Sequence, residues 1–256
     1  MPDGLRFAFG TLSVLPVRVD RWDRPTAGRA MLAAPLVGVV LGALAAGAGA
    51  LAAWRAGGLL GAVAAVGVLA ALTRGLHLDG LADVADGLGS GKPAEDALRI
   101  MKQSDIGPFG VLTLVLVMLA QIAVIAGQFD ASLGRGALAV LTAAVAGRCA
   151  LGWGCRAGVP AARPGGLGAA VAGTVPALGA VAVTAGCAVL LGAAGLPFGL
   201  RAPVWPAALA VGLGCAVLLL RRCVRRLDGI TGDVLGAMAE TAATGALVAL
   251  ALIGTG

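Results

Sequence analysis

Long apolar runs separated by short polar segments are the main pattern along this chain. A helix that crosses a bilayer needs about 20 mostly apolar residues, and seven runs approach that length. Arg74 interrupts the second run early, so we expect that span to be tilted or to continue into the polar segment behind it. The expected spans are Met31–Trp54, Leu59–Leu72, Phe109–Gln128, Gly136–Trp153, Gly173–Leu196, Val204–Leu220 and Val234–Ile253.

This pattern predicts an all-α, polytopic integral membrane protein with about seven transmembrane helices. No internal repeat and no second domain are visible, so residues 1–256 form one expected membrane-embedded domain. Its polar segments are residues 74–108, 154–172 and 221–233.

The distribution of Lys and Arg predicts the orientation. With seven spans and a cytoplasmic N-terminus, nearly all of these residues fall on the cytoplasmic side, and Arg148 lies within a span. Only Arg55, Arg135 and Arg201 fall on the opposite side. This asymmetry is the one that the positive-inside rule describes. All three polar segments then face the cytoplasm, where we expect the active face.

Composition supports a membrane protein and argues against a nucleic-acid partner. Hydrophobic residues make up 59% of the chain and charged residues only 12%, whereas soluble domains carry about a quarter charged residues. The net charge of +6 is spread between apolar runs, and the chain has no Tyr and few other aromatic residues that could stack on bases. The expected partners are therefore membrane lipid and small molecules.

The densest chemical signal is the sequence His-Leu-Asp-Gly-Leu-Ala-Asp-Val-Ala-Asp at residues 77–86. In a helix, Asp79, Asp83 and Asp86 share one face. Three carboxylates on adjacent turns repel one another unless a cation neutralises them, and oxygen ligands suit Mg²⁺. Asp105 is a plausible fourth ligand. His77 falls on another face, so it is either an acid or base or a packing residue.

A second polar cluster precedes and enters the last span. Arg226 is either a membrane anchor or a ligand for phosphate oxygens, which Arg binds well. Thr231 or Asp233 is a candidate cap for the last helix. Glu240 lies deeper on the face of Asp233, and an ionisable group at that depth is a functional candidate. Arg163, in a loop rich in Pro and Gly, binds an anion or sets topology.

Carboxylates and arginines on one membrane face are typical of a metal-dependent site for a phosphorylated substrate. The motifs that carry them resemble those of the cobalamin synthase family, the adenosylcobinamide-GDP ribazoletransferases. One departure is Gln-Ser-Asp at 103–105, where many members have Asp-Ser-Arg or Asp-Ser-His, so that the acidic residue of this segment is displaced to Asp105. The matching segments are residues 77–87, 100–102, 106–110, 163–168 and 231–237 followed by Glu240, together with 9–16 and 35–38.

The resemblance implies a Mg²⁺-dependent enzyme of the bacterial cytoplasmic (inner) membrane. Such an enzyme joins GDP-activated adenosylcobinamide to α-ribazole, or to its 5′-phosphate, and releases GMP. The 5′-hydroxyl of ribazole attacks the phosphorus that bears cobinamide.

The roles that follow for this chain fall into three groups. Asp79, Asp83 and Asp86, with Asp105, would bind metal. Asp83 or Asp233 would accept the hydroxyl proton, with His77 as a further catalytic candidate. The expected substrate-binding residues are Arg163 and Arg226, which would hold GMP, together with Thr231 and Glu240.

Two other classes of protein share features with this chain. A CDP-alcohol phosphotransferase also carries Asp-Gly-x-x-Ala at a membrane edge, but that family has Arg after the Ala and a longer spacing to its last aspartates. A transporter would show half-sequence repeats and mid-membrane charges, whereas these acids gather at one face. Helices rich in small residues leave room for a homo-oligomer with a groove between protomers.

Overall fold

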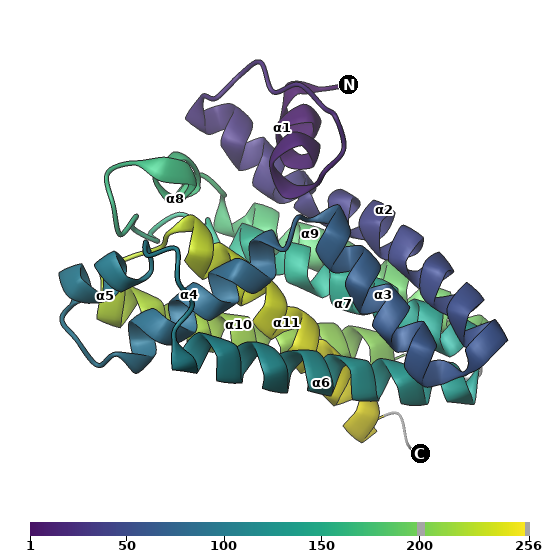
Figure 1. Ribbon diagram of the computed structural model, residues 1–256. Helices are drawn as coiled ribbons and strands as arrows, with labels where there is room; N and C mark the ends of the chain where they lie inside the picture. Colours follow the sequence, from purple (N-terminus) through teal and green to yellow (C-terminus); the bar gives the residue numbers. More distant parts are fainter. Residues whose placement is uncertain (199–202, 254–256) are drawn as a thin grey trace.

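The computed structural model describes residues 1–198 and 203–253, and helices form nearly all of its regular structure. Within this part of the chain no β-strand is present, and two isolated bridges tie loops together. Figure 1 shows the arrangement of the elements. The helices are α1 (Asp3–Leu12), α2 (Arg24–Ala56), α3 (Gly58–Leu72), α4 (Leu76–Gly89), α5 (Ala94–Ile100), α6 (Pro108–Ala131), α7 (Leu133–Gly154), α8 (Gly166–Val171), α9 (Ala177–Gly195), the short 3₁₀ turn η1 (Leu196–Phe198), α10 (Val204–Leu227) and α11 (Gly232–Ile253).

Six of the described helices are long and apolar enough to cross a membrane: α2, α6, α7, α9, α10 and α11. The seventh candidate is the pair α3 and α4, which pass the same test together but meet at an angle of 89°. Arg74 and Gly75 cause the bend, because both adopt left-handed backbone conformations (φ 55° and 66°) that end α3. The fold class is confirmed as a multi-pass helical membrane protein, and the short second span ends at this bend, after which α4 carries the acidic segment.

The helix boundaries correct three expectations. Helix α2 begins at Arg24, before the expected Met31, because Asp23 caps it by accepting the Thr26 N–H at 2.9 Å and Pro25 occupies its first turn. Helix α9 begins at Ala177 and not at Gly173. Helix α10 continues past Leu220 to Leu227 and ends where Asp228 turns left-handed (φ 61°). The arginines at 221–226, expected in a polar segment after the span, therefore lie in the last turns of α10.

Helix α7 is the central element of the bundle. It is largely buried and packs against α2, α6, α9, α10 and α11. Small residues make this possible, because a Cβ on Gly38 would lie 2.7 Å from the Ala144 carbonyl oxygen and one on Gly147 would lie 2.9 Å from that of Ala239. Such close backbone approach is typical of membrane helix interfaces.

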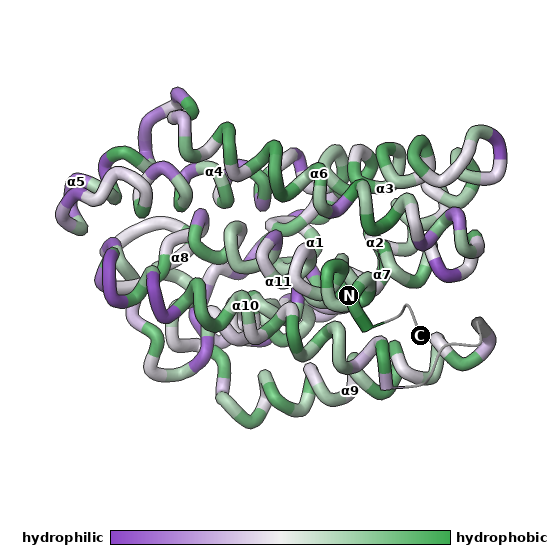
Figure 2. Tube along the Cα trace, turned by 90° about the horizontal axis from the view of Figure 1, so that it is seen from below, coloured by the Kyte–Doolittle hydropathy of each residue, from purple (hydrophilic) through white to green (hydrophobic). Residues whose placement is uncertain are grey.

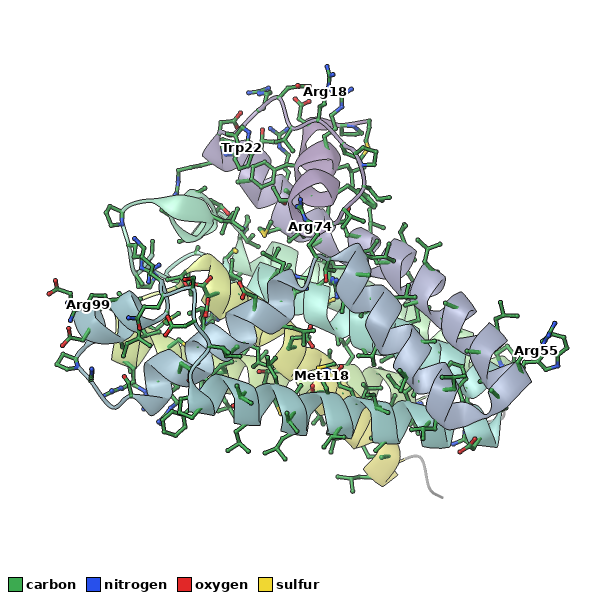
Figure 3. All side chains as sticks on the ribbon, in the orientation of Figure 1. Arg18, Trp22, Arg55, Arg74, Arg99 and Met118 are labelled. Atoms are coloured by element: carbon green, nitrogen blue, oxygen red, sulfur yellow. The ribbon has the colours of Figure 1, made fainter. Side chains whose placement is uncertain are left out.

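The polar segments gather at the ends of the long helices. Figure 2 shows hydrophilic stretches around α5 and α8 and again at the turns at the other end of the bundle. Arg99 on α5 and Arg55 at the end of α2 lie at these opposite ends (Figure 3). Arg201, which was expected on the same side as Arg55, lies outside the described residues. The end that carries α5 also carries the acidic segment.

Candidate active site

Helix α4 carries the three aspartates at the spacing that the sequence suggested. The helix begins at Leu76, directly after the left-handed Gly75. Asp79 is exposed, Asp83 is half-buried and Asp86 is buried. The helical prediction for this segment is confirmed, but the three carboxylates have different surroundings.

Asp86 is bound by the beginning of α6. Its Oδ2 accepts the Gly107 N–H at 2.8 Å and its Oδ1 accepts the Gly110 N–H at 2.9 Å. These are the free N–H groups of a helix N-terminus, where a negative charge is favoured. A side chain on Gly110 would place its Cβ 2.5 Å from Oδ2, so glycine is needed there. Asp86 therefore fastens α6 to α4, and its predicted role as a metal ligand stays a prediction.

Helix α11 lies directly against α4 and brings Asp233 to the cluster. A Cβ on Gly80 would lie 2.7 Å from the Asp233 carbonyl oxygen, and one on Gly236 would lie 3.2 Å from the His77 Cα. Asp83 is consequently close enough to Asp79, Asp86, Asp233 and Arg163 for their charges to interact. The structure thus assembles four carboxylates and one guanidinium from three segments far apart in the sequence.

Thr231 caps α11 and orients Asp233. Its hydroxyl accepts the Val234 N–H at 3.2 Å and donates to Asp233 Oδ2 at 3.1 Å. The expectation that Thr231 or Asp233 caps this helix is met by Thr231. Asp233 is left half-buried at the mouth of a pocket.

The loop that carries Arg163 is tied to the start of α11. Ala162 N donates to the Ile230 carbonyl at 2.9 Å, and Ile230 N donates to the Pro160 carbonyl at 2.9 Å. The Arg163 guanidinium donates to the carbonyl of Leu98 in α5, and it also lines the pocket at Asp233. This places a positive charge beside the acidic cluster, and substrate binding by Arg163 stays a prediction.

Arg226 lies farther out. Its Nη2 donates to the Lys92 carbonyl at 3.1 Å, in an exposed position. It therefore supports the turn between α4 and α5. Binding of GMP by Arg226 stays a prediction.

Residues of the acidic cluster line two pockets. The first, here the Asp233 pocket, has a volume of about 300 Å³ and is lined by His77, Arg163, Thr231 and Asp233 above apolar side chains. The second, the Asp83 pocket, has about 310 Å³ and is lined by Asp83, Asp86, Lys92, Asp105 and the start of α6. Asp105 is exposed there, and its predicted role as a metal ligand stays a prediction.

Glu240 occupies a separate, interior polar cluster. Gln121 Nε2 donates to Glu240 Oε2 and to Thr244 Oγ1, each at 2.9 Å. Arg148, only 2% exposed, is close enough for its charge to interact with that of Glu240. Sequence reasoning did not assign Gln121 or Arg148, although a polar side chain inside an apolar run is itself a signal of function.

His77 lies between this cluster and the Asp233 pocket. It is 3% exposed and lines both the pocket and a small interior cavity of about 30 Å³ beside Arg148 and Glu240. Its Nε2 and the Nε and Nη2 of Arg148 have no hydrogen-bond partner within the described residues. A polar cavity of this size has room for water, which would satisfy these groups.

The carboxylates fit a Mg²⁺ ion that is shared with a substrate and do not form a closed protein cage. Among the described residues, no three His, Cys, Asp or Glu side chains are grouped tightly enough to hold a metal ion. Mg²⁺ commonly takes only one or two carboxylates, however, together with substrate phosphates and water. Asp79, which is exposed, and Asp83, one helical turn away and half-buried, would supply that donor set.

Comparison with known proteins identifies the family. The model of the family described as "Cobalamin-5-phosphate synthase" matches residues 4–251. The adenosylcobinamide-GDP ribazoletransferase of Frankia casuarinae is 44% identical, over 96% of this chain and 94% of its own length. That of Nocardioides sp. is 45% identical over 98% and 99%, and that of Pseudomonas putida 41% over 94% and 95%.

No solved structure matches this chain. The sequence relatives nevertheless agree with one another in name and cover nearly the whole chain, which favours the resemblance over the two alternatives considered above. The acidic motif on α4 and the segments that fold around it thus lie within the matched region. The chain belongs to the cobalamin-5-phosphate synthase family.

Proposed function

We propose that this chain transfers the cobinamide phosphate of adenosylcobinamide-GDP to α-ribazole, or to its 5′-phosphate, and releases GMP. Its relatives carry the name of this reaction. The observation that carries the proposal is the acidic cluster, whose residues line two pockets and which has Arg163 beside it. Two substrates can then meet at one set of carboxylates.

The reaction exchanges one P–O bond for another. The ribazole 5′-oxygen forms a bond to the phosphorus that bears cobinamide, and the bond from that phosphorus to the bridging oxygen of GMP breaks. The hydroxyl proton passes to Asp233 or Asp83, whose half-buried carboxylates face the two pockets. Arg163 compensates the negative charge that builds up on the leaving phosphate.

Mg²⁺ is part of this proposal. Asp79 and Asp83 would hold the ion, and a bound Mg²⁺ neutralises diphosphate oxygens. Repulsion among the carboxylates favours a cation here, because Asp83 lies near three other acids and only one arginine. We place the enzyme in the bacterial cytoplasmic membrane with this face toward the cytoplasm, on the basis of its Lys and Arg distribution.

The test uses purified, membrane-inserted protein supplied with adenosylcobinamide-GDP and α-ribazole. We expect adenosylcobalamin and GMP to form with Mg²⁺ and not with EDTA. Asp83→Asn should abolish turnover and still insert, while Asp96→Asn, on the exposed face of α5, serves as the matched control. Absence of product in every condition would refute the function, and full activity in EDTA would refute the metal.

A further inference from the structure

The lining of the Asp233 pocket combines buried apolar side chains with a few polar ones. Leu12 of α1, Met31 of α2 and Leu151 of α7 are each at most 4% exposed, and we call them the apolar floor. The polar side chains, here called the polar wall, are those of His77 on α4, Arg163 in the loop before α8, and Thr231 and Asp233 at the start of α11. Helix α1, outside the main bundle in Figure 1, thus contributes to a site at the acidic cluster.

Size restricts what this pocket can hold. Its volume of about 300 Å³ is at the lower end for pockets that enclose a small molecule. One nucleoside fits such a space, whereas a corrin ring with its side chains does not. Most of the large substrate must therefore lie outside the pocket, which has room for the acceptor nucleoside or for a part of the large substrate of similar size.

The chemistry of the floor restricts the occupant further. Burying a polar edge without hydrogen-bond partners is costly, and guanine carries donors and acceptors along its edge. Leu12, Met31 and Leu151 offer no side-chain partner for that edge. The dimethylbenzimidazole base of α-ribazole is planar and mostly apolar, and its two methyl groups gain from burial against such a floor.

The polar wall also gives the nucleoside a direction. With the base on the apolar floor, the ribose faces Asp233, whose Oδ2 is held by the Thr231 hydroxyl at 3.1 Å. Asp83 on the other pocket is close enough to Asp233 for their charges to interact. A 5′-hydroxyl at Asp233 would thus lie close to a diphosphate at Asp83, as attack on its phosphorus requires.

We propose that the Asp233 pocket is the binding site for the acceptor nucleoside and selects it by its apolar base. The GDP-activated substrate binds outside it, on the side of the Asp83 pocket. This inference rests on the function proposed above and deepens it. It also assigns specificity for the base to Leu12, Met31 and Leu151.

The first test narrows the pocket at Leu167, a partly exposed lining residue on the short helix α8. For Leu167→Trp we expect the KM for α-ribazole to rise by about tenfold or more, with the KM for adenosylcobinamide-GDP changed by less than about twofold. Leu178→Trp, at a side chain 79% exposed on α9, is the matched control and should leave both unchanged. A rise confined to the KM for adenosylcobinamide-GDP would overturn the proposal.

The second test uses the wild-type protein, so it does not depend on the folding of a variant. Removing two buried methyl groups costs about tenfold in affinity, and we expect that rise in KM for a riboside of unsubstituted benzimidazole. Equal KM values for the two ribosides would overturn the proposal. If the wild-type protein makes no product from α-ribazole at all, the proposed function itself fails, which distinguishes the two failures.

Discussion

Asp86 differs from its two neighbours on α4 in what it contacts. Asp79 and Asp83 are accessible to substrate, whereas both oxygens of Asp86 accept backbone N–H groups of α6. A carboxylate in this position neutralises the orphan donors of a helix N-terminus. The three aspartates of this motif therefore differ in their surroundings: two are open to substrate, and the third is bound by the backbone of α6.

Asp86→Asn should lower the stability of the fold. The amide retains one acceptor oxygen and turns its NH₂ toward an N–H group, so we expect a loss of about 1–3 kcal/mol in the free energy of unfolding. Thermal unfolding in detergent measures it. Asp79→Asn, at an exposed side chain, is the comparison and should unfold at the wild-type temperature. Equal unfolding temperatures for the two variants would show that Asp86 does not fasten α6.

The interior pair of Arg148 and Glu240 allows a second prediction at this scale. The two buried groups are close enough for their opposite charges to interact, and a buried charge that loses such an interaction is destabilising. Arg148→Met and Glu240→Gln should therefore each destabilise the protein. The double variant should be more stable than the sum of the two losses implies, by about 0.5–3 kcal/mol.

Unfolding of all four proteins in one detergent gives this coupling energy. If the loss in free energy of unfolding of the double variant equals the sum of the two single losses, the charges of Arg148 and Glu240 do not stabilise each other. Thr142→Val, at a buried residue of α7 whose hydroxyl donates to the Leu138 carbonyl at 2.8 Å, can be paired with Glu240→Gln as a control cycle without a charge partner.

At the level of elements, the contact between α4 and α11 determines the geometry of the site. Gly80 and Gly236 let the two backbones approach, and this approach places Asp233 beside the aspartates of α4. A catalytic arrangement tolerates little displacement, because an error of about 1 Å can cost about 10²-fold in rate. Glycine at 80 therefore serves the site as well as the packing.

Gly80→Ala should reduce kcat strongly. Its Cβ would meet the Asp233 backbone at 2.7–2.9 Å, which α11 can relieve only by moving away. We expect kcat to fall by about 10- to 100-fold. Gly67→Ala in α3, where a Cβ meets nothing within 4 Å, is the matched control and should keep wild-type turnover. Steady-state kinetics with saturating substrates measure both, and equal rates would show that the contact is not needed.

Much of the molecule could be predicted from the sequence, because apolar runs of sufficient length must become helices in a bilayer. The spacing of Asp79 and Asp83 likewise indicated one helical face. The partner of Asp86 could not be predicted, since Gly107 and Gly110 come to it only through the fold. Leu12 gave no sign of lining a pocket, because a single Leu beside a polar loop has no distinctive pattern.

The sequence also predicts which end of the whole molecule faces the cytoplasm. Arg99 and Arg55 lie at opposite ends of the bundle (Figure 3). The acidic cluster lies toward the end with Arg99, and the excess of Lys and Arg on this side predicts that it faces the cytoplasm. The substrates proposed above carry several charges, so they are expected to reach the site from the cytoplasm.

Cysteine labelling in intact cells tests this orientation. Arg55→Cys should react with a membrane-impermeant maleimide added from outside, whereas Arg99→Cys should react only after the cells are opened. Both side chains are exposed, so accessibility within the fold does not distinguish them, and denatured samples control for expression. The reverse pattern would place the acidic cluster outside, and charged substrates made in the cytoplasm would then not reach it.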